Sequence, residues 1–282
     1  MQRGERVDNK IALCDMHVHS RTSHDSSAKV TDTAVAAIEK GIVALAITDH
    51  CDIQCADELD VISLVKSSFS EALEAGEIFD GRVKILKGIE LGEAIWNMPY
   101  AENVLKALPY DVVIGSVHAV RYKGYTDSYS TIDFTEMSHS ELDGYLELYF
   151  DEVLEMLEKV DCDIMAHLTC PLRYINGKYG LGIDATKYRG KISNILDCII
   201  KKNIALEINT SGLGTAFDSL MPEKWVIELY KEKGGRLITL GSDAHVSERV
   251  GNGFDKTIKL LKACGFDAYY YYEKRKAVRC QI

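Results

Sequence analysis

Short apolar runs alternate with helical patterns along almost the whole chain. Each run is rich in Ile, Val and Leu, which is typical of strands buried on both faces of a parallel sheet. The runs occupy residues 11–19, 43–50, 84–92, 111–118, 162–168, 204–210 and 236–245. Strand and helix alternating over seven rounds indicate parallel strands joined by right-handed crossovers. The pattern predicts an α/β fold, and a closed or nearly closed barrel accommodates the seven units better than two sheets.

Helical spacing of apolar residues fills most of the intervals between these runs. Thr31 is expected to cap a helix that continues to Lys40, with Gly41 as its stop. The longest helical pattern, at residues 140–160, places its leucines and a phenylalanine on one stripe. Further helices are expected at residues 59–79, 186–203, 221–233 and 253–264.

The end of the chain departs from this alternation. Four consecutive tyrosines, at residues 269–272, lie in a stretch that is either an extra strand or a docked tail. The sequence shows no linker, low-complexity segment or short repeat. We therefore expect one barrel domain over residues 1–282, with a motif-bearing core at 11–265 and a C-terminal strand or tail at 266–282.

Composition and charge narrow the classes of function. The chain is 46% hydrophobic and 27% charged, which is typical of a soluble globular protein. It lacks both an apolar run of roughly 18 residues and a secretory signal, and its eight cysteines form no CxxC pair. These features predict a cytoplasmic protein with reduced thiols and no membrane partner. The net charge of −10 argues against stable nucleic-acid binding, and a small anionic substrate would need a local positive site.

Polar residues gather where the apolar runs end. Six of the eight histidines stand at these ends, and parallel barrels place their chemistry at the C-terminal ends of the strands. His17 and His19, two residues apart, face the same side of a strand. The full set is His17, His19, Asp49, His50, Glu90, His118, His167, Glu207, Asn209, Asp243 and His245. Because imidazole and carboxylate are the ligands of zinc, iron and manganese, the sequence predicts a site for several metal ions.

Residues near these positions have different expected roles. Asp15 and Asp49 lie one or two residues from a ligand histidine, where a carboxylate can orient an imidazole. Of Glu207 and Asn209, we expect only Asn209 to face the pocket. His139, in the segment SHSE, is expected at the start of the long helix and outside the site.

The order of the motifs resembles the polymerase and histidinol phosphatase (PHP) superfamily of metal-dependent phosphoesterases. The motifs are HVH, ITDH, GIE, SVH, AH and SDAH, and they extend over residues 13–246. LEINTSGL after the sixth run and the chain length make the sequence most similar to the stand-alone histidinol-phosphatases. This resemblance implies a distorted (β/α)7 barrel that binds three divalent metal ions, which are zinc, manganese or iron.

The resemblance also implies how the ligands divide among the metals. They would be His17, His19, Glu90 and Asp243 for the first metal, Glu90, His118 and His167 for the second, and Asp25, His50 and His245 for the third. His24 is the alternative to Asp25, because both lie in the loop after His19.

The implied reaction is attack on a phosphate monoester by a metal-bound hydroxide. The metal-bound hydroxide would be held by Glu90, Asp243 and His118. A divalent metal can supply it because metal binding lowers the pKa of water enough to form hydroxide near neutral pH. Arg173 in HLTCPLRY matches the arginine that reaches the phosphate in the histidinol-phosphatases. Asn209 and Arg121 are further candidates for substrate contacts.

Three functions are compatible with these motifs. The first is hydrolysis of L-histidinol phosphate in histidine biosynthesis. The second is the same chemistry on nucleotides, short oligonucleotides or phosphotyrosine. The third is a metal-binding regulatory module without catalysis, against which the full ligand set argues. The loops at 51–58 and 119–138, with Tyr122, Tyr125 and Tyr129, are expected to line the pocket for a small phosphorylated substrate; the sequence does not distinguish between oligomeric states.

Overall fold

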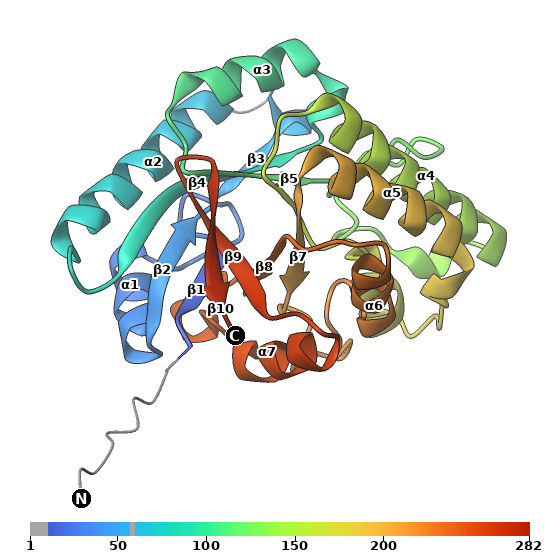
Figure 1. The fold of residues 1–282 in the computed structure, drawn as a ribbon. Helices are drawn as coiled ribbons and strands as arrows, with labels where there is room; N and C mark the ends of the chain where they lie inside the picture. The colour runs from blue at the N-terminus through green and yellow to red at the C-terminus, as the bar shows by residue number, and fades with distance from the viewer. Residues whose placement is uncertain (1–10, 57–59) are drawn as a thin grey trace, which may run out of the picture.

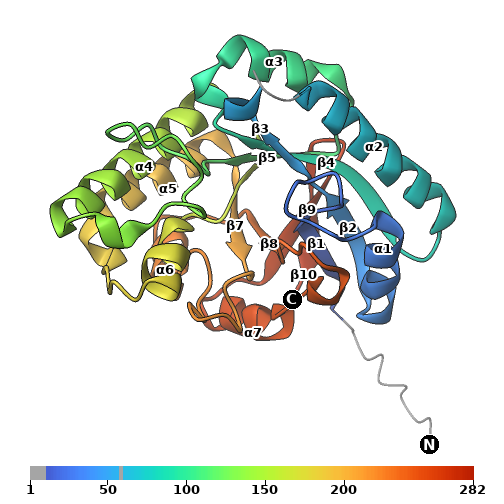
Figure 2. The same ribbon diagram turned by 180° about the vertical axis from the view of Figure 1, so that it is seen from behind.

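The computed structural model describes residues 11–56 and 60–282. Within these residues a parallel sheet curves into a nearly closed barrel with helices on its outside (Figures 1 and 2). Its strands, in spatial order, are β1 (Leu13–Val18), β2 (Ile42–Ile47), β4 (Lys84–Gly92), β5 (Val112–Ser116), β6 (Ile164–Met165), β7 (Ala205–Asn209) and β8 (Ile238–Gly241), and β3 (His50–Asp52) also pairs with β4. The α/β barrel predicted from the sequence is confirmed.

The barrel closes where β8 meets β1. Val18 forms a parallel bridge with Ala244, and the Asp243 backbone N–H donates to the His17 carbonyl at 2.7 Å. Residues of β1, β5 and β7 are almost all buried, as expected for strands enclosed on both faces. The seam therefore joins the two ends of the sheet at the point where His17, His19 and Asp243 leave it.

Helices follow most strands, close to the predicted ranges. They are α1 (Val30–Glu39), α2 (Val61–Ile78), α3 (Met98–Ala107), α4 (His139–Lys159), α5 (Arg189–Lys202), α6 (Lys224–Glu232) and α7 (Phe254–Ala263). α3 was not predicted, because only Ala101 and Val104 form its buried side. The expected Thr31 cap is wrong. The cap position of α1 is Lys29, and Thr31 lies inside the first turn, while Gly41 follows the helix with a φ of 72°.

The C-terminal segment is a β-hairpin that covers the N-terminal end of the barrel. β9 (Ala268–Glu273) and β10 (Lys276–Gln281) pair antiparallel, and they lie in front of the barrel in Figure 1 and behind it in Figure 2. The Tyr269 hydroxyl accepts from the Cys14 N–H at 2.8 Å and donates to the Ala12 carbonyl. Tyr272 is also buried, whereas the two tyrosines between them are partly exposed. Of the two alternatives for this segment, the strand is thus the one observed.

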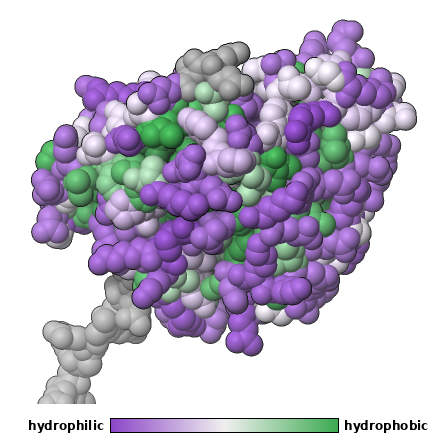
Figure 3. Space-filling view, turned by 90° about the horizontal axis from the view of Figure 1, so that it is seen from above, coloured by the Kyte–Doolittle hydropathy of each residue, from purple (hydrophilic) through white to green (hydrophobic). Residues whose placement is uncertain are grey.

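The outer surface is mostly polar. Figure 3 shows hydrophilic residues over most of one face, with separate apolar patches between them. Large exposed apolar side chains on α1 and α2 are Val35, Leu64, Leu73 and Ile78. In the part of the chain that the structure describes, no helix is both long and apolar enough to cross a membrane.

Candidate metal centre

Six imidazole rings meet at the C-terminal end of the barrel. They come from the ends of β1, β2, β5, β6 and β8 and from the segments that follow these strands. Neighbouring ring centroids are separated by 4.2 Å for His19 and His50, 4.2 Å for His19 and His245, and 5.3 Å for His118 and His167. Because parallel strands end at the same edge, residues 150 or more positions apart become neighbours there. The structure therefore brings together the histidines singled out in the sequence.

Glu90 lies at the centre of this cluster and is fully buried. Its Oε1 is 3.1 Å from His118 Nε2 and 2.9 Å from His167 Nε2. Its Oε2 is 2.9 Å from His50 Nδ1 and 3.3 Å from His17 Nε2. Burial alone would raise the pKa of this carboxyl, but the surrounding imidazoles hold its pKa well below the ordinary value. An ionised carboxylate at this position can bridge two cations.

Asp243 provides a second carboxylate at the barrel seam. Its Oδ1 lies 3.2 Å from His19 Nε2 and 3.5 Å from His245 Nδ1. Its backbone has a φ of 51°, which is unfavourable for a residue with a side chain. The seam hydrogen bond to His17 holds this conformation, so the fold fixes the direction of the Asp243 carboxylate.

Asp25 and His24 differ in how they meet the cluster. Asp25 Oδ2 is 3.2 Å from His245 Nε2, and its Oδ1 is 3.7 Å from His50 Nε2. Both residues are exposed, but no ion pair joins His24 to any described residue of the cluster, and its ring centroid is 5.7 Å from that of His50. Burial raises the pKa of the Asp25 carboxyl, but its contacts with His245 and His50 outweigh this and lower the pKa. The geometry thus favours Asp25 over His24 as a ligand.

The donor atoms of the cluster fit metal ions. Among the described residues, His17 Nε2, His19 Nε2, His50 Nδ1 and Glu90 Oε2 are buried and form no hydrogen bond of suitable geometry, although Glu90 Oε2 makes ion-pair contacts with His50 and His17. Buried polar atoms rarely remain unpartnered, so four at one point indicate a group that binds there. Five groups of three residues each place their possible ligand atoms within 4.8 Å of one another: His17–His19–Asp243, His17–Glu90–His167, His50–Glu90–His118, His19–His50–His245 and Asp52–Glu93–His118. Imidazole and carboxylate donors of this kind suit zinc, manganese and iron.

The His19 imidazole is prepared for ligation by its surroundings. Burial, together with the neighbouring rings of His50 and His245, lowers the pKa of His19 to about 4. Its Nδ1 is 3.1 Å from the Ser23 hydroxyl, which donates to Asp49 Oδ1 at 2.7 Å. The hydroxyl can therefore accept from Nδ1–H, which leaves the lone pair on Nε2. Asp49 acts on this imidazole through Ser23, in line with the orienting role expected from the sequence.

Asp15 supports the backbone of the site. Its carboxylate accepts from the Ser242 and Gly251 N–H groups, each at 2.9 Å, and at 3.4 Å from the His17 N–H. Burial raises the pKa of Asp15 to about 6. Asp15 therefore ties β1 to the segment after β8, as a group of the barrel interior.

Two further carboxylates hold the segment that carries His118. Asp52 Oδ1 is 3.0 Å from His118 Nδ1. Glu93, with a φ of 47°, accepts from the backbone N–H groups of His118 and Ala119. Burial, with the nearby charge of Asp52, raises the pKa of Glu93 to about 8. Neither residue was predicted from the sequence, although Asp52 follows His50 by two positions, the spacing that relates His17 to His19.

The expectation that only Asn209 faces the site is wrong. Residues two positions apart on a strand share a face, so Glu207 and Asn209 both point inward. Asn209 Nδ2 is 3.2 Å from Glu207 Oε2 and 3.3 Å from Asp243 Oδ2. Glu207 Oε1 is in turn 2.7 Å from His17 Nδ1. His139 is exposed at the start of α4, behind the Ser138 cap, as expected.

A cavity of about 170 Å³ opens over the cluster. Asp52, Gln54, Ser128 and Tyr129 from the two expected loops line it, and residues 57–59 lie outside the described residues. Arg173, which begins the π-helical segment η4 (Arg173–Lys178), also lines it.

The two candidate arginines differ in position. Arg173 donates to Ser211 Oγ at 2.9 Å, and that hydroxyl donates to Asp243 Oδ2 at 3.2 Å. Arg121 is exposed, lies 4.9 Å from the centre of the Trp96 ring and is not among the residues that line the cavity. The structure thus brings Arg173 to the cluster but not Arg121.

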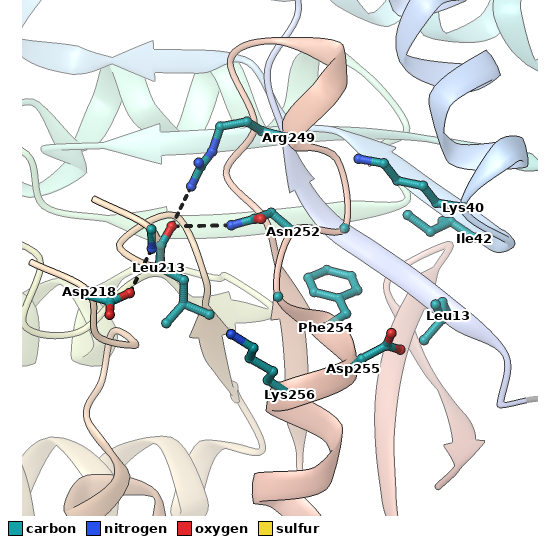
Figure 4. A pocket seen from close by; sticks show the side chains of 13 residues that line it. Leu13, Lys40, Ile42, Leu213, Asp218, Arg249, Asn252, Phe254, Asp255 and Lys256 are labelled. Carbon is teal, nitrogen blue, oxygen red and sulfur yellow. Dashed lines mark hydrogen bonds between the residues drawn. The ribbon is translucent and has the colours of Figure 1, made fainter. Parts of the chain in front are cut away.

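A larger cavity, of about 690 Å³, lies elsewhere, between α1, the start of α7 and the segment after β7 (Figure 4). Arg249 donates there to the carbonyls of Ser211 and Leu213, and Lys40 donates to that of Val250. None of the residues that line this cavity belongs to the imidazole cluster. These contacts anchor the segment that follows His245, and the imidazole cluster borders only the smaller of the two cavities.

A parallel α/β barrel that carries imidazole and carboxylate donors at its C-terminal end is typical of metal-binding barrel proteins. Residues 15–211 match the PHP domain family, and the chain belongs to this family. The protein named probable histidinol-phosphatase from Thermotoga maritima is 27% identical over 270 residues, covering 96% of this chain and 100% of that protein. The histidinol-phosphatase of Lactococcus lactis subsp. lactis is 28% identical over 258 residues, covering 89% and 91%.

The fold is also similar to a solved structure. This is the crystal structure of histidinol phosphate phosphatase from Lactococcus lactis subsp. lactis, complexed with zinc, L-histidinol and phosphate. The TM-score is 0.77 at 22% identity, over 95% of this chain and 100% of that one. At this identity the likeness shows a shared fold.

Proposed function

We propose that this protein is a phosphoric monoester hydrolase that converts L-histidinol phosphate to L-histidinol and phosphate. The observation that carries the proposal is the set of unpartnered imidazole and carboxylate atoms around Glu90, which face a cavity that Arg173 also lines. Bound divalent cations would supply Lewis acidity and an activated water. The names of the relatives from Thermotoga maritima and Lactococcus lactis support the choice of substrate.

We propose three cation positions, divided as the resemblance to the PHP family implies, and the contacts of Glu90, Asp243 and Asp25 with the imidazoles support this division. Glu90 would serve two of them, because its Oε1 lies near His118 and His167 while its Oε2 lies near His17. The proposed ligand sets are His17, His19, Glu90 and Asp243; Glu90, His118 and His167; and Asp25, His50 and His245. Zinc, manganese and iron all suit these donors.

Arg173 is the proposed phosphate contact. Ser211 holds one nitrogen of its guanidinium, which leaves further donors for a phosphoryl group. A guanidinium can bind phosphate through two parallel hydrogen bonds, and these fix orientation as well as supply affinity. Its place on the cavity wall beside Asp243 supports a role in holding the phosphoryl end of the substrate.

The cavity wall also suits the amine and imidazole of histidinol. Tyr129 and Tyr174 line the cavity with ring centroids 5.4 Å apart, and their faces can pack against an imidazole. Asp52, on the same wall, offers negative charge to an ammonium group. We propose that these three side chains select the leaving group.

A panel of phosphate monoesters tests the proposal. The metal-loaded protein should be assayed on L-histidinol phosphate, p-nitrophenyl phosphate, phosphotyrosine and several nucleotides. A kcat/KM for histidinol phosphate at least about 100-fold higher corresponds to about 2.7 kcal/mol of differential transition-state binding and supports the assignment. Equal or better turnover of a nucleotide or phosphotyrosine would contradict the assignment of L-histidinol phosphate as substrate, but not the proposed hydrolysis of phosphate monoesters. Absence of turnover on every ester would indicate a non-catalytic metal-binding module.

A further inference from the structure

A buried carboxylate on β7, Glu207, contacts three parts of the candidate metal centre. It is fully buried. Its Oε1 lies 2.7 Å from His17 Nδ1, and its Oε2 accepts from the His167 backbone N–H at 2.6 Å. The same Oε2 is 3.2 Å from Asn209 Nδ2. One side chain thus joins the end of β1, the segment after β6 and β7 itself.

The neighbouring strand leaves space for this contact. A Cβ on Gly241 of β8 would overlap Glu207 Oε1 and would lie 2.7 Å from His17 Cβ. Glycine is therefore required at this position because the paired carboxylate and imidazole occupy the space of a side chain.

The same arrangement recurs on the other side of the centre. His118 Nδ1 is 3.0 Å from Asp52 Oδ1, and a Cβ on Gly92 would overlap that carboxylate oxygen. In each pair the imidazole turns its Nδ1 to a carboxylate and its Nε2 toward Glu90. Asp52 also lines the cavity and could touch a substrate, whereas Glu207 does not line it. A substitution at Glu207 therefore tests the support of the histidine without removing a possible substrate contact.

The polarity of its neighbours requires a carboxylate at residue 207. A neutral imidazole that donates from Nδ1 keeps its lone pair on Nε2, the nitrogen that faces Glu90 in His17. Both partners of Glu207 Oε2, the His167 N–H and the Asn209 amide, are donors. A glutamine would have to point its NH2 group either at these donors or at His17 Nδ1. In the second case it would place the His17 proton on Nε2, where it blocks ligation.

We propose that Glu207 is a positioning residue that fixes the tautomer and direction of His17 and thereby sets the affinity of the centre for its cations. It acts through His17 and touches neither substrate nor the reacting atoms. The inference rests on the metal centre of the proposed function, and it goes beyond that proposal by assigning the determinant of affinity to a residue that is not a ligand.

Zinc affinity of the metal-free protein, measured by competition with a chromophoric chelator, tests this role. Glu207→Gln should weaken the tightest sites by about 10- to 100-fold, the usual effect of removing a group that orients a metal-binding imidazole. The matched control is Asp163→Asn at the opposite end of the barrel. Asp163 is a buried carboxylate that accepts from the Val113 N–H at 2.8 Å and from Arg275. This control should lower thermal stability but change zinc affinity less than about threefold.

The possible results separate the two proposals. Glu207→Gln with zinc affinity within about threefold of the unmodified chain, or an equal loss in Asp163→Asn, would overturn the positioning role alone. An unmodified chain that takes up no zinc would overturn the proposed function and this inference with it.

A measurement on the unmodified chain avoids any effect of the substitution on folding. Nitrogen-15 correlation spectra of the zinc-loaded protein should show His17 protonated at Nδ1 and bound to zinc through Nε2. Zinc bound through His17 Nδ1 would overturn the proposal.

Discussion

The Asp25 carboxylate lies 3.2 Å from His245 Nε2, although Asp25 belongs to the loop after β1 and His245 follows β8. Asp25 also reaches His50 at 3.7 Å, whereas the ring of the adjacent His24 is 5.7 Å from that of His50, centroid to centroid. Asp25→Ala should therefore reduce kcat/KM on L-histidinol phosphate by about 100-fold or more, since loss of a ligand empties a cation position.

His24→Ala should have a milder effect than Asp25→Ala, and His139→Ala, on the exposed start of α4, should leave kcat/KM nearly unchanged. A greater loss of kcat/KM in His24→Ala than in Asp25→Ala would show that His24, and not Asp25, completes the proposed third cation position.

Arg173 should contribute mainly to substrate binding. Its guanidinium is held on the cavity wall by Ser211 before substrate arrives. Arg173→Ala should then raise KM more than it lowers kcat, because a contact already formed in the ground state contributes uniform binding. Steady-state kinetics on L-histidinol phosphate measure both constants. Arg189→Ala, which removes an exposed arginine over Trp225, is the control, and a fall in kcat with unchanged KM for Arg173→Ala would refute this role.

The hydroxyl of Tyr269 should contribute to stability but not to activity. It is buried and bonds both the Cys14 N–H and the Ala12 carbonyl, which joins the C-terminal hairpin to β1. Tyr269→Phe leaves two backbone groups without this partner and should lower the free energy of unfolding by about 1–3 kcal/mol. Denaturant unfolding measures the loss, and Tyr270→Phe, at a partly exposed position, should cost less. Equal free energies of unfolding for the two variants would contradict a stabilising role for the hydrogen bonds of the Tyr269 hydroxyl.

Zinc affinity should rise with pH. Burial favours the neutral form of His17, His50 and His118, but Glu90 and the other nearby carboxylates outweigh it and raise each pKa well above the ordinary value. A raised pKa means that these imidazoles keep their protons to higher pH than free imidazole does, and a cation that binds them must displace those protons.

Chelator competition should therefore give weaker zinc binding at about pH 6 than at about pH 8, the range in which histidines change charge. Calorimetry in buffers of different ionisation enthalpy should detect proton release on binding. Equal affinity at both pH values would show that the imidazoles are already neutral before metal binds.

The barrel and the members of its histidine cluster could be predicted because both depend on local periodicity. A buried parallel strand is an apolar run, and the residue that ends it must lie at the site. His118 and His167 are separated by 49 positions, yet each follows a predicted strand, and their Nε2 atoms lie 3.4 Å apart. Capping and short helices were harder to predict. The start of α1 at Val30 depends on packing and not on a side-chain cap at Thr31.

Contacts between side chains from distant elements were not predictable from one sequence. The contact of Glu207 with His17 spans 190 positions, and no periodic pattern connects the two residues. The place of Arg121 depends on the path of a loop, which turns its guanidinium onto Trp96. A regular strand sets the direction of its side chains, but an irregular loop does not, so the residues of the imidazole cluster were easier to predict than those that line the cavity.

Metal content per chain tests the central claim most directly. Protein prepared without chelators and saturated with zinc or manganese should be freed of excess ion and analysed by elemental mass spectrometry. We predict about three ions per chain, one for each proposed ligand set of imidazole and carboxylate donors. Glu90→Gln should hold fewer ions, because Glu90 belongs to two of the three proposed ligand sets. A folded preparation that retains at most one ion per chain at saturating metal would contradict the proposed centre.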